Sequence, residues 1–152
     1  MARIGAVVLP LFSGFGAGAV AQRLNDAAAR GLITADGFFR KGSLVPLKPV
    51  ADEALRSVDS LETVVVLRHT GVTVDMLARR DHWWHNVVAQ ASPNAPPAGT
   101  AAEDPLMIIY TSGTTGRPKG AVHTHCGFPV KAAQDMCFGT DVHAGDRVYW
   151  VT

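Results

Sequence analysis

The residues best suited to chemistry lie together in residues 110–120, which read Tyr-Thr-Ser-Gly-Thr-Thr-Gly-Arg-Pro-Lys-Gly. Three glycines allow the backbone to turn sharply and to bring its N–H groups close to an anion. Lys119 adds a positive charge, and four hydroxyl side chains add hydrogen-bond donors: Thr111, Ser112, Thr114 and Thr115. We interpret the segment as a phosphate-binding loop that follows a strand. The alternative is a flexible Gly/Thr loop at the surface.

The loop does not have the Walker pattern of the common nucleotide triphosphatases. That pattern places four residues between its two glycines and follows its lysine with Ser or Thr. Here only two residues separate Gly113 from Gly116, and Gly120 follows Lys119.

Apolar runs and helical periodicity predict alternating strands and helices around this loop. We expect strands at residues 4–9, 32–34, 63–67, 106–110 and 147–151, and helices at residues 17–30, 46–58, 82–91 and 130–137. Such alternation predicts an α/β fold with a mostly parallel sheet and flanking helices. Ligands of parallel sheets gather at the carboxyl ends of the strands, so the turns after Leu11, Thr34 and Tyr110 are candidate sites.

The composition limits the classes of protein. A chain of 152 residues with 47% hydrophobic and 18% charged residues is long enough for one folded domain and is unlike a disordered segment. The net charge of +1 gives no field that would recruit nucleic acid or an anionic membrane, and we expect neither partner. Two cysteines suit a reducing cytoplasm. Residues 1–21 admit a second interpretation, a signal peptide cleaved before Gln22.

The loop sequence Thr-Ser-Gly-Thr-Thr-Gly-Arg-Pro-Lys-Gly resembles the phosphate-loop signature of the adenylate-forming acyl-CoA synthetases, most of all the AMP-forming acetyl-CoA synthetases. Flanking motifs extend the resemblance over nearly the whole chain, and they lie in order at residues 2–7, 19–24, 32–37, 45–48, 80–85, 102–106, 122–125 and 145–150. Because residue 1 then corresponds to the interior of a family domain, the resemblance argues against the signal peptide.

The resemblance implies a ligase with two half-reactions. A carboxylate attacks the α-phosphate of ATP, giving acyl-AMP and pyrophosphate, and the CoA thiol then displaces AMP. The family pattern implies ATP, Mg²⁺ and CoA, with a short-chain acid such as acetate or propionate as substrate. The residues implied in holding the β- and γ-phosphates are Thr111, Ser112, Gly113, Thr114, Thr115, Gly116 and Lys119.

The resemblance also implies a CoA site, from which this sequence departs twice. The first of two family arginines near the 3′-phosphate of CoA falls on Arg40, but the second falls on Ser43. Phe12 and Gly14 match a family turn that packs against the CoA nucleotide, and Ser13 replaces a glycine between them. Lys41 could substitute for the missing arginine only as a point charge.

By resemblance, residues 1–152 form part of the N-terminal AMP-binding domain, and the adenylation lysine and the C-terminal domain are absent from them. We therefore predict no catalytic residue and no metal site within the chain, and no ligation by these residues alone. The pattern gives no oligomeric state. The second hypothesis is a stand-alone nucleotide-binding or interaction module that keeps the loop without ligase activity.

Overall fold

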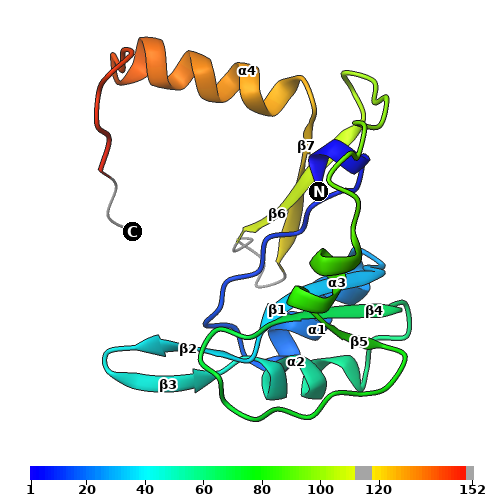
Figure 1. Cartoon of the computed structure of the whole chain (residues 1–152). Coiled ribbons are helices and arrows are strands. Elements are labelled where there is room, and N and C mark those ends of the chain that lie inside the picture. Colours follow the sequence, from blue (N-terminus) through cyan, green and yellow to red (C-terminus); the bar gives the residue numbers. More distant parts are fainter. Residues whose placement is uncertain (112–117, 150–152) are drawn as a thin grey trace. The chain divides into compact units, whose positions relative to one another are not determined.

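The computed structural model describes residues 1–111 and 118–149. They form two compact units, one made of residues 11–95 and the other of residues 1–10 together with residues from 96 onward (Figure 1). The unit of residues 11–95 is thus inserted in the chain between the two parts of the other unit.

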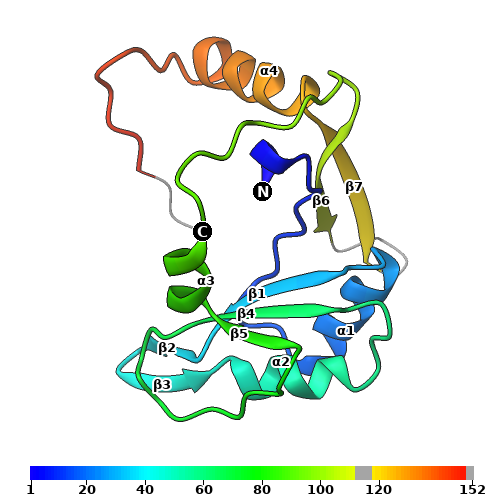
Figure 2. The ribbon, with the colours of Figure 1, turned by 45° about the vertical axis from the view of Figure 1, so that its right-hand side comes forward.

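The unit of residues 11–95 is built on a parallel sheet. Its three strands are β1 (Gly31–Ala35), β4 (Thr63–Leu67) and β5 (Asp81–Trp83), in the order β1-β4-β5. Gly31 pairs with Thr63 and Val64 with Asp81. Helices α1 (Ala17–Asp26) and α2 (Lys48–Leu55) lie together on one face of this sheet (Figures 1 and 2). The core side chains come from these helices, the central strand and the turn after α2: Val20, Ala21, Leu24, Ala51, Ala54, Val58, Val64 and Val66.

Two further elements complete this unit. A two-stranded antiparallel hairpin of β2 (Gly37–Arg40) and β3 (Ser43–Pro46) begins two residues after the carboxyl end of β1. Helix α3 (Trp84–Gln90) follows β5 directly, and none of its residues is buried. Only one residue of the hairpin, Gly37, is buried, so core packing contributes little to holding it.

The other unit contains an antiparallel pair, β6 (Pro105–Thr111) and β7 (Lys119–Thr124), preceded by a short 3₁₀ helix η1 (Ala2–Ile4). Helix α4 (Gly127–Gln134) continues into a π-helical turn η2 (Asp135–Gly139). The N-terminal segment joins β6 through a single parallel bridge between Val8 and Met107, whose neighbouring hydrogen bonds measure 2.9 and 2.8 Å.

The α/β class with a parallel sheet and flanking helices is confirmed, and the strands expected near residues 32–34, 63–67 and 106–110 are present. The strand expected at residues 4–9 is wrong, because only Val8 bridges and Ile4 is 62% exposed in η1. The helix expected over residues 17–30 ends at Asp26, since Ala28 adopts a left-handed φ of 45°. Residues 147–149 form no strand; the rest of that prediction lies outside the described residues.

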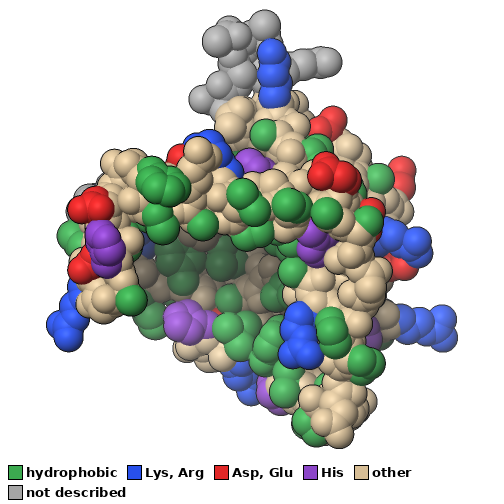
Figure 3. All heavy atoms as spheres, turned by 90° about the horizontal axis from the view of Figure 1, so that it is seen from above, with side chains coloured by type: hydrophobic (Ala, Val, Ile, Leu, Met, Phe, Trp, Pro, Cys, Tyr) green, Lys and Arg blue, Asp and Glu red, His purple; other side chains and the backbone are tan. Residues whose placement is uncertain are grey.

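The surface of the described residues carries apolar as well as charged side chains. The face in Figure 3 shows hydrophobic side chains at the surface as well as Lys, Arg, Asp and Glu side chains. Several large hydrophobic side chains are exposed, Phe138 and Tyr149 to 88%. None of the helices in the described part of the chain is long and apolar enough to cross a membrane.

Candidate functional site

The ends of the predicted phosphate-binding loop are held together by the β6–β7 pair. Thr111 is the last residue of β6 and Lys119 the first of β7, and the two are direct partners across the strands. Both are exposed. Ser112, Gly113, Thr114, Thr115 and Gly116 lie outside the described residues, so their contact with phosphate stays a prediction.

Gly120 lets the two strands approach closely beside the loop. Tyr110 pairs with Gly120, and a Cβ atom there would lie 2.9 Å from Ile108 Cγ2 and 3.3 Å from Tyr110 Cζ. The first distance is shorter than real Cβ contacts and the second is tighter than most, so a larger residue would displace the Ile108 side chain. The last glycine of the motif therefore packs beneath Tyr110.

Phe12 and Gly14 lie together in the loop before α1. The Phe12 ring is 62% exposed and meets Phe15 edge to face, with ring centroids 5.7 Å apart. A Cβ on Gly14 would approach Phe12 Cε1 to 2.5 Å, so this glycine makes room for the ring. The guanidinium of Arg23 lies 4.2 Å from the centroid of the Phe15 ring.

A pocket of about 140 Å³ opens beside this loop at the carboxyl end of β1, where ligands of parallel sheets collect. Most of its wall is apolar, which suits a flat or aliphatic group more than an ion. The lining residues are Leu11, Phe12, Ser13, Phe15, Val20, Leu32, Ile33, Thr34, Leu47, Val50 and Ala51.

Arg40 stands at the tip of the β2–β3 hairpin and is exposed. The tip is a two-residue turn in which Lys41 and Gly42 have φ angles of 50° and 78°, as in a type I′ turn. Arg40 and Ser43 are direct partners across this hairpin. Partnered residues have Cβ atoms about 5 Å apart, so arginines at both positions could bind the same phosphate. Among the described residues, no carboxylate forms an ion pair with Arg40.

Asp36 connects the sheet, the hairpin and the segment after β4. Its buried carboxylate accepts four backbone hydrogen bonds of 2.8–3.0 Å, one from Gly37 and three from consecutive residues 69–71. Its backbone carbonyl accepts a 3.2 Å bond from Leu47 N–H, and its own N–H donates to Leu67 O at 2.9 Å. Desolvation alone would raise the pKa of Asp36, but the four N–H donors outweigh it and lower the pKa to about 2.

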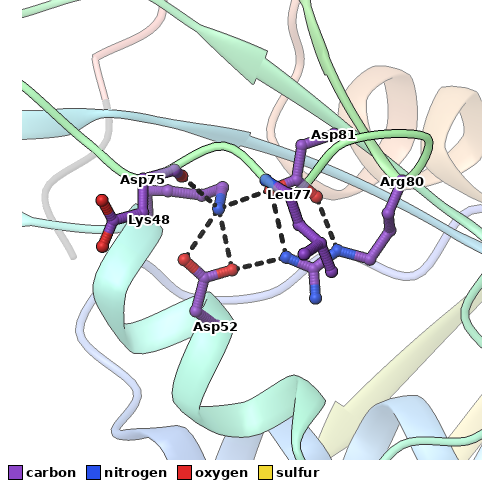
Figure 4. A network of polar contacts seen from close by, with 6 residues as sticks. All are labelled: Lys48, Asp52, Asp75, Leu77, Arg80 and Asp81. Carbon is purple, nitrogen blue, oxygen red and sulfur yellow. Dashed lines mark hydrogen bonds and ion pairs between the residues drawn. The ribbon is translucent and has the colours of Figure 1, made fainter.

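A second polar network surrounds Lys48, two residues past the end of β3 (Figure 4). The buried ammonium of Lys48 contacts both oxygens of Asp52 at 2.7 Å, the carbonyl of Asp75 at 2.9 Å and Asp81 Oδ2 at 2.8 Å. Arg80 contacts Asp52 at 2.7 Å and Asp81 at 2.5 Å. The network joins α2, the segment before β5 and β5 itself.

These contacts shift the ionisation of two members. Burial alone would raise the pKa of Asp81, but hydrogen bonds from Arg80, Lys48 and the Leu77 N–H lower it to about 2. The hydrogen bond to Asp81 raises the pKa of Arg80. Both members are therefore charged at neutral pH, and the network balances two cations against two carboxylates.

Neither arrangement is evident from the sequence. The partners of Asp36 at residues 69–71 are more than 30 residues away along the chain, so no local pattern indicates them. The spacing of Lys48 and Asp52, four residues apart on a helix, was the one local signal of the second network. No group of three or more His, Cys, Asp or Glu that could hold a metal ion occurs among the residues that the structure describes.

Comparison with known proteins extends over the whole chain. The family model described as "AMP-binding enzyme" matches residues 1–152. The acetyl-coenzyme A synthetase of Salmonella typhimurium is 47% identical over 153 residues, and that of Methanothrix thermoacetophila is 45% identical over 151. Each alignment covers 99% of this chain, which spans only 23% of the length of either relative.

A solved structure gives the same indication. The acetoacetyl-CoA synthetase from Streptomyces lividans matches 91% of this chain with a TM-score of 0.76 and 26% sequence identity, over 21% of its own length. The resemblance to adenylate-forming acyl-CoA synthetases found in the loop and its flanking motifs is confirmed. The chain belongs to the AMP-binding enzyme family.

Proposed function

We propose that this chain is a segment of an AMP-forming acyl-CoA synthetase for a short-chain carboxylate. In the first half-reaction the carboxylate oxygen bonds to the α-phosphorus of ATP and pyrophosphate leaves; in the second the CoA thiol bonds to the acyl carbon and AMP leaves. The observation that carries the proposal is the motif of residues 110–120 at the junction of β6 and β7, in a chain 45–47% identical to acetyl-CoA synthetases over its length.

We assign residues 111–119 to the β- and γ-phosphates of ATP. The β6–β7 register supports the assignment, because pairing of Thr111 with Lys119 brings the two ends of the loop together. A hydroxyl and an ammonium from these ends would then face the same anion, as charge stabilisation of a leaving pyrophosphate requires. Mg²⁺ would enter bound to ATP. In this proposal the reaction takes place in the cytoplasm, where ATP and CoA are available and where free Cys126 and Cys137 stay reduced.

We assign Phe12, Gly14 and Arg40 to CoA. The exposed Phe12 ring and the apolar pocket suit the base, and Arg40 suits the 3′-phosphate. Both the pocket and Arg40 are close to β1 in the chain: residues 32–34 of β1 line the pocket, and the hairpin that carries Arg40 begins two residues after β1. Arg40 is six residues from Thr34 of the pocket wall, which limits their separation to about 20 Å. In CoA the base and the 3′-phosphate are attached to the same ribose, so the assignment requires the pocket and the Arg40 guanidinium to lie much closer together than this upper limit.

Pyrophosphate exchange tests the assignment of the loop to ATP. The native polypeptide that contains these residues, at the length the cell makes it, is assayed for acetate- or propionate-dependent ATP–pyrophosphate exchange. Lys119→Ala should lower exchange about 100-fold. Lys131→Ala, which removes an exposed lysine of α4, should change it less than about twofold. Equal effects of the two substitutions would refute the assignment.

A second assay tests the CoA site without involving the loop. Arg40→Ala should raise the KM for CoA about tenfold, with no effect on the KM for 3′-dephospho-CoA or on exchange. Arg30→Ala, at an exposed arginine of the same unit, is the control. Ser43→Arg should lower the KM for CoA, because the phosphate would neutralise two facing arginines. An Arg40→Ala enzyme with unchanged KM would refute the CoA assignment and leave the loop assignment intact.

The alternative, a nucleotide-binding module without ligase activity, makes a different prediction for the same polypeptide. It should bind ATP and melt at a higher temperature when ATP is present, yet show neither exchange nor CoA-dependent release of AMP. The apolar pocket and the exposed Arg40 favour the synthetase, since a module that binds ATP alone uses neither.

A further inference from the structure

The hairpin that carries Arg40 has little packing of its own. A two-stranded hairpin is marginally stable in water, and most of its side chains here are exposed or half-buried. Phe39 is 65% exposed and Leu44 41%. What fixes its direction must therefore act at its base, where Gly37 pairs with Pro46.

Asp36 is the residue that holds this base. Through its carboxylate it fixes the first hairpin residue, Gly37, to residues 69–71 after β4, and through its carbonyl it fixes Leu47, just past the other strand. Both strands of the hairpin and the central strand of the sheet are thus connected through one buried residue, by its backbone as well as its side chain. Lys48, the residue that follows Leu47, is also 0% exposed, and its ammonium is anchored on the carbonyl of Asp75.

We propose that Asp36 is a positioning residue for CoA, acting through Arg40 by fixing the angle at which the β2–β3 hairpin leaves the sheet. The inference rests on the proposed binding of the 3′-phosphate by Arg40. Asp36 itself is buried in backbone contacts and does not touch the ligand.

The geometry of the hairpin gives the expected magnitude. Arg40 is three residues beyond Gly37, a distance of about 10 Å along a strand. A change of about 10° at the base would then move Arg40 by nearly 2 Å, more than a bidentate phosphate contact tolerates. Misplacement of that size costs between about tenfold and 100-fold in an oriented interaction.

The first test replaces Asp36 with Asn, which has nearly the same shape but loses the charge and half of the acceptor capacity. Asp36→Asn should raise the KM for CoA about tenfold in the native polypeptide. The KM for 3′-dephospho-CoA and the rate of ATP–pyrophosphate exchange should change less than about twofold, because neither uses the 3′-phosphate. Val64→Ala is the matched control: it opens a cavity at a fully buried position of the same sheet without touching the hairpin.

A second variant perturbs the base while leaving the carboxylate in place. A Cβ at Gly37 would lie 2.9 Å from the backbone oxygen of Val45, so Gly37→Ala must push the two strands apart. It should reproduce the selective loss of CoA. Hydrogen exchange gives an independent measurement: amides of residues 37–45 should exchange faster in Asp36→Asn and in Gly37→Ala, and not in Val64→Ala.

The double variant Asp36→Asn/Arg40→Ala completes the test. If Asp36 acts through Arg40, Asp36→Asn should not raise the KM for CoA any further once Arg40 has been replaced by Ala. Additive effects, or an Asp36→Asn effect that Val64→Ala reproduces, would overturn the inference while the CoA assignment stands. If Arg40→Ala alone leaves CoA binding unchanged, the CoA assignment fails and the inference fails with it.

Discussion

Replacing Lys48 with Met should destabilise the unit of residues 11–95 by about 3 kcal/mol. The substitution removes the ammonium of the network in Figure 4 but keeps a side chain of similar length. Asp81, whose side chain is 0% exposed, loses one charged hydrogen bond, which accounts for about 2 kcal/mol. The carbonyl of Asp75 loses its 2.9 Å donor, about 1 kcal/mol more. Asp52 adds little, because its side chain is 32% exposed and keeps Arg80.

Urea unfolding followed by tryptophan fluorescence provides the assay. The tryptophans are at residues 83, 84 and 150, and a Trp150→Phe background leaves Trp83 and Trp84 to report on this unit. Arg30→Met is the matched control, because it breaks an ion pair whose two side chains are 76% and 60% exposed. It should shift the midpoint little, since exposed pairs contribute only a few tenths of a kcal/mol.

The coupling between Lys48 and Asp81 decides whether the reasoning is right. In the double variant Lys48→Met/Asp81→Asn, the loss should be smaller than the sum of the single losses by at least about 1 kcal/mol. A Lys48→Met protein that loses no more than Arg30→Met would refute the argument. Additive single losses would show that the 2.8 Å contact contributes nothing to stability.

Three further predictions concern the same unit. Asp36 and Asp81 have folded pKa values of about 2 against an ordinary 3.8, so each contributes about 2 kcal/mol above pH 4 that is lost as the pH falls through 2. Acid unfolding curves should show this loss, and Asp36→Asn should reduce it; an unchanged curve would contradict the shift. Lys41→Asn should raise the free energy of unfolding by up to about 1 kcal/mol, measured as a higher urea midpoint, because Asn tolerates the left-handed φ of 50° better than Lys; a lower midpoint would exclude strain at this turn. Gly14→Ala should displace the exposed Phe12 ring, because the new Cβ would lie 2.5 Å from Phe12 Cε1, and should weaken CoA binding severalfold, with a melting temperature close to that of the parent; unchanged CoA binding would remove Phe12 from the site.

Local signals predicted the central strands well. Residues 63–67 are a run of β-branched and aliphatic side chains, and the strand has those bounds because both of its neighbours pair with it. The same kind of run at residues 4–9 failed. An apolar sequence favours burial but does not supply a partner, and in this segment only Val8 finds one, at Met107.

The hairpin of residues 37–46 could not have been foreseen from turn residues alone. A type I′ turn is normally indicated by Asn-Gly or Asp-Gly, whereas Lys41 occupies the first position here. The antiparallel pairing around the phosphate motif was missed for a related reason. The apolar residues of the segment 119–124, Ala121 and Val122, are adjacent, so the segment lacks the hydrophobic alternation that indicates a strand, and its pairing with β6 is visible only in the folded chain.

The residues of the candidate site also fall into those that the sequence indicates and those that only the fold reveals. Arg40, Phe12 and the loop residues came from motifs that are contiguous in sequence. The buried contacts of Asp36 and Asp81 join segments about 30 residues apart, so only the folded chain reveals them. A charged residue at the end of a strand predicts neither its burial nor its partners.

The discontinuity of one unit affects how the chain folds during synthesis. Val8 leaves the ribosome 99 residues before its bridge partner Met107. At ordinary translation rates that interval lasts between about 5 and 20 s. All of residues 11–95 emerge within it, so that unit can fold while the N-terminal segment still lacks its strand. During this interval Val8, which is half-buried in the folded chain, has no strand partner and is accessible to chaperones. A substitution that slows folding of the inserted unit would not by itself prolong that exposure.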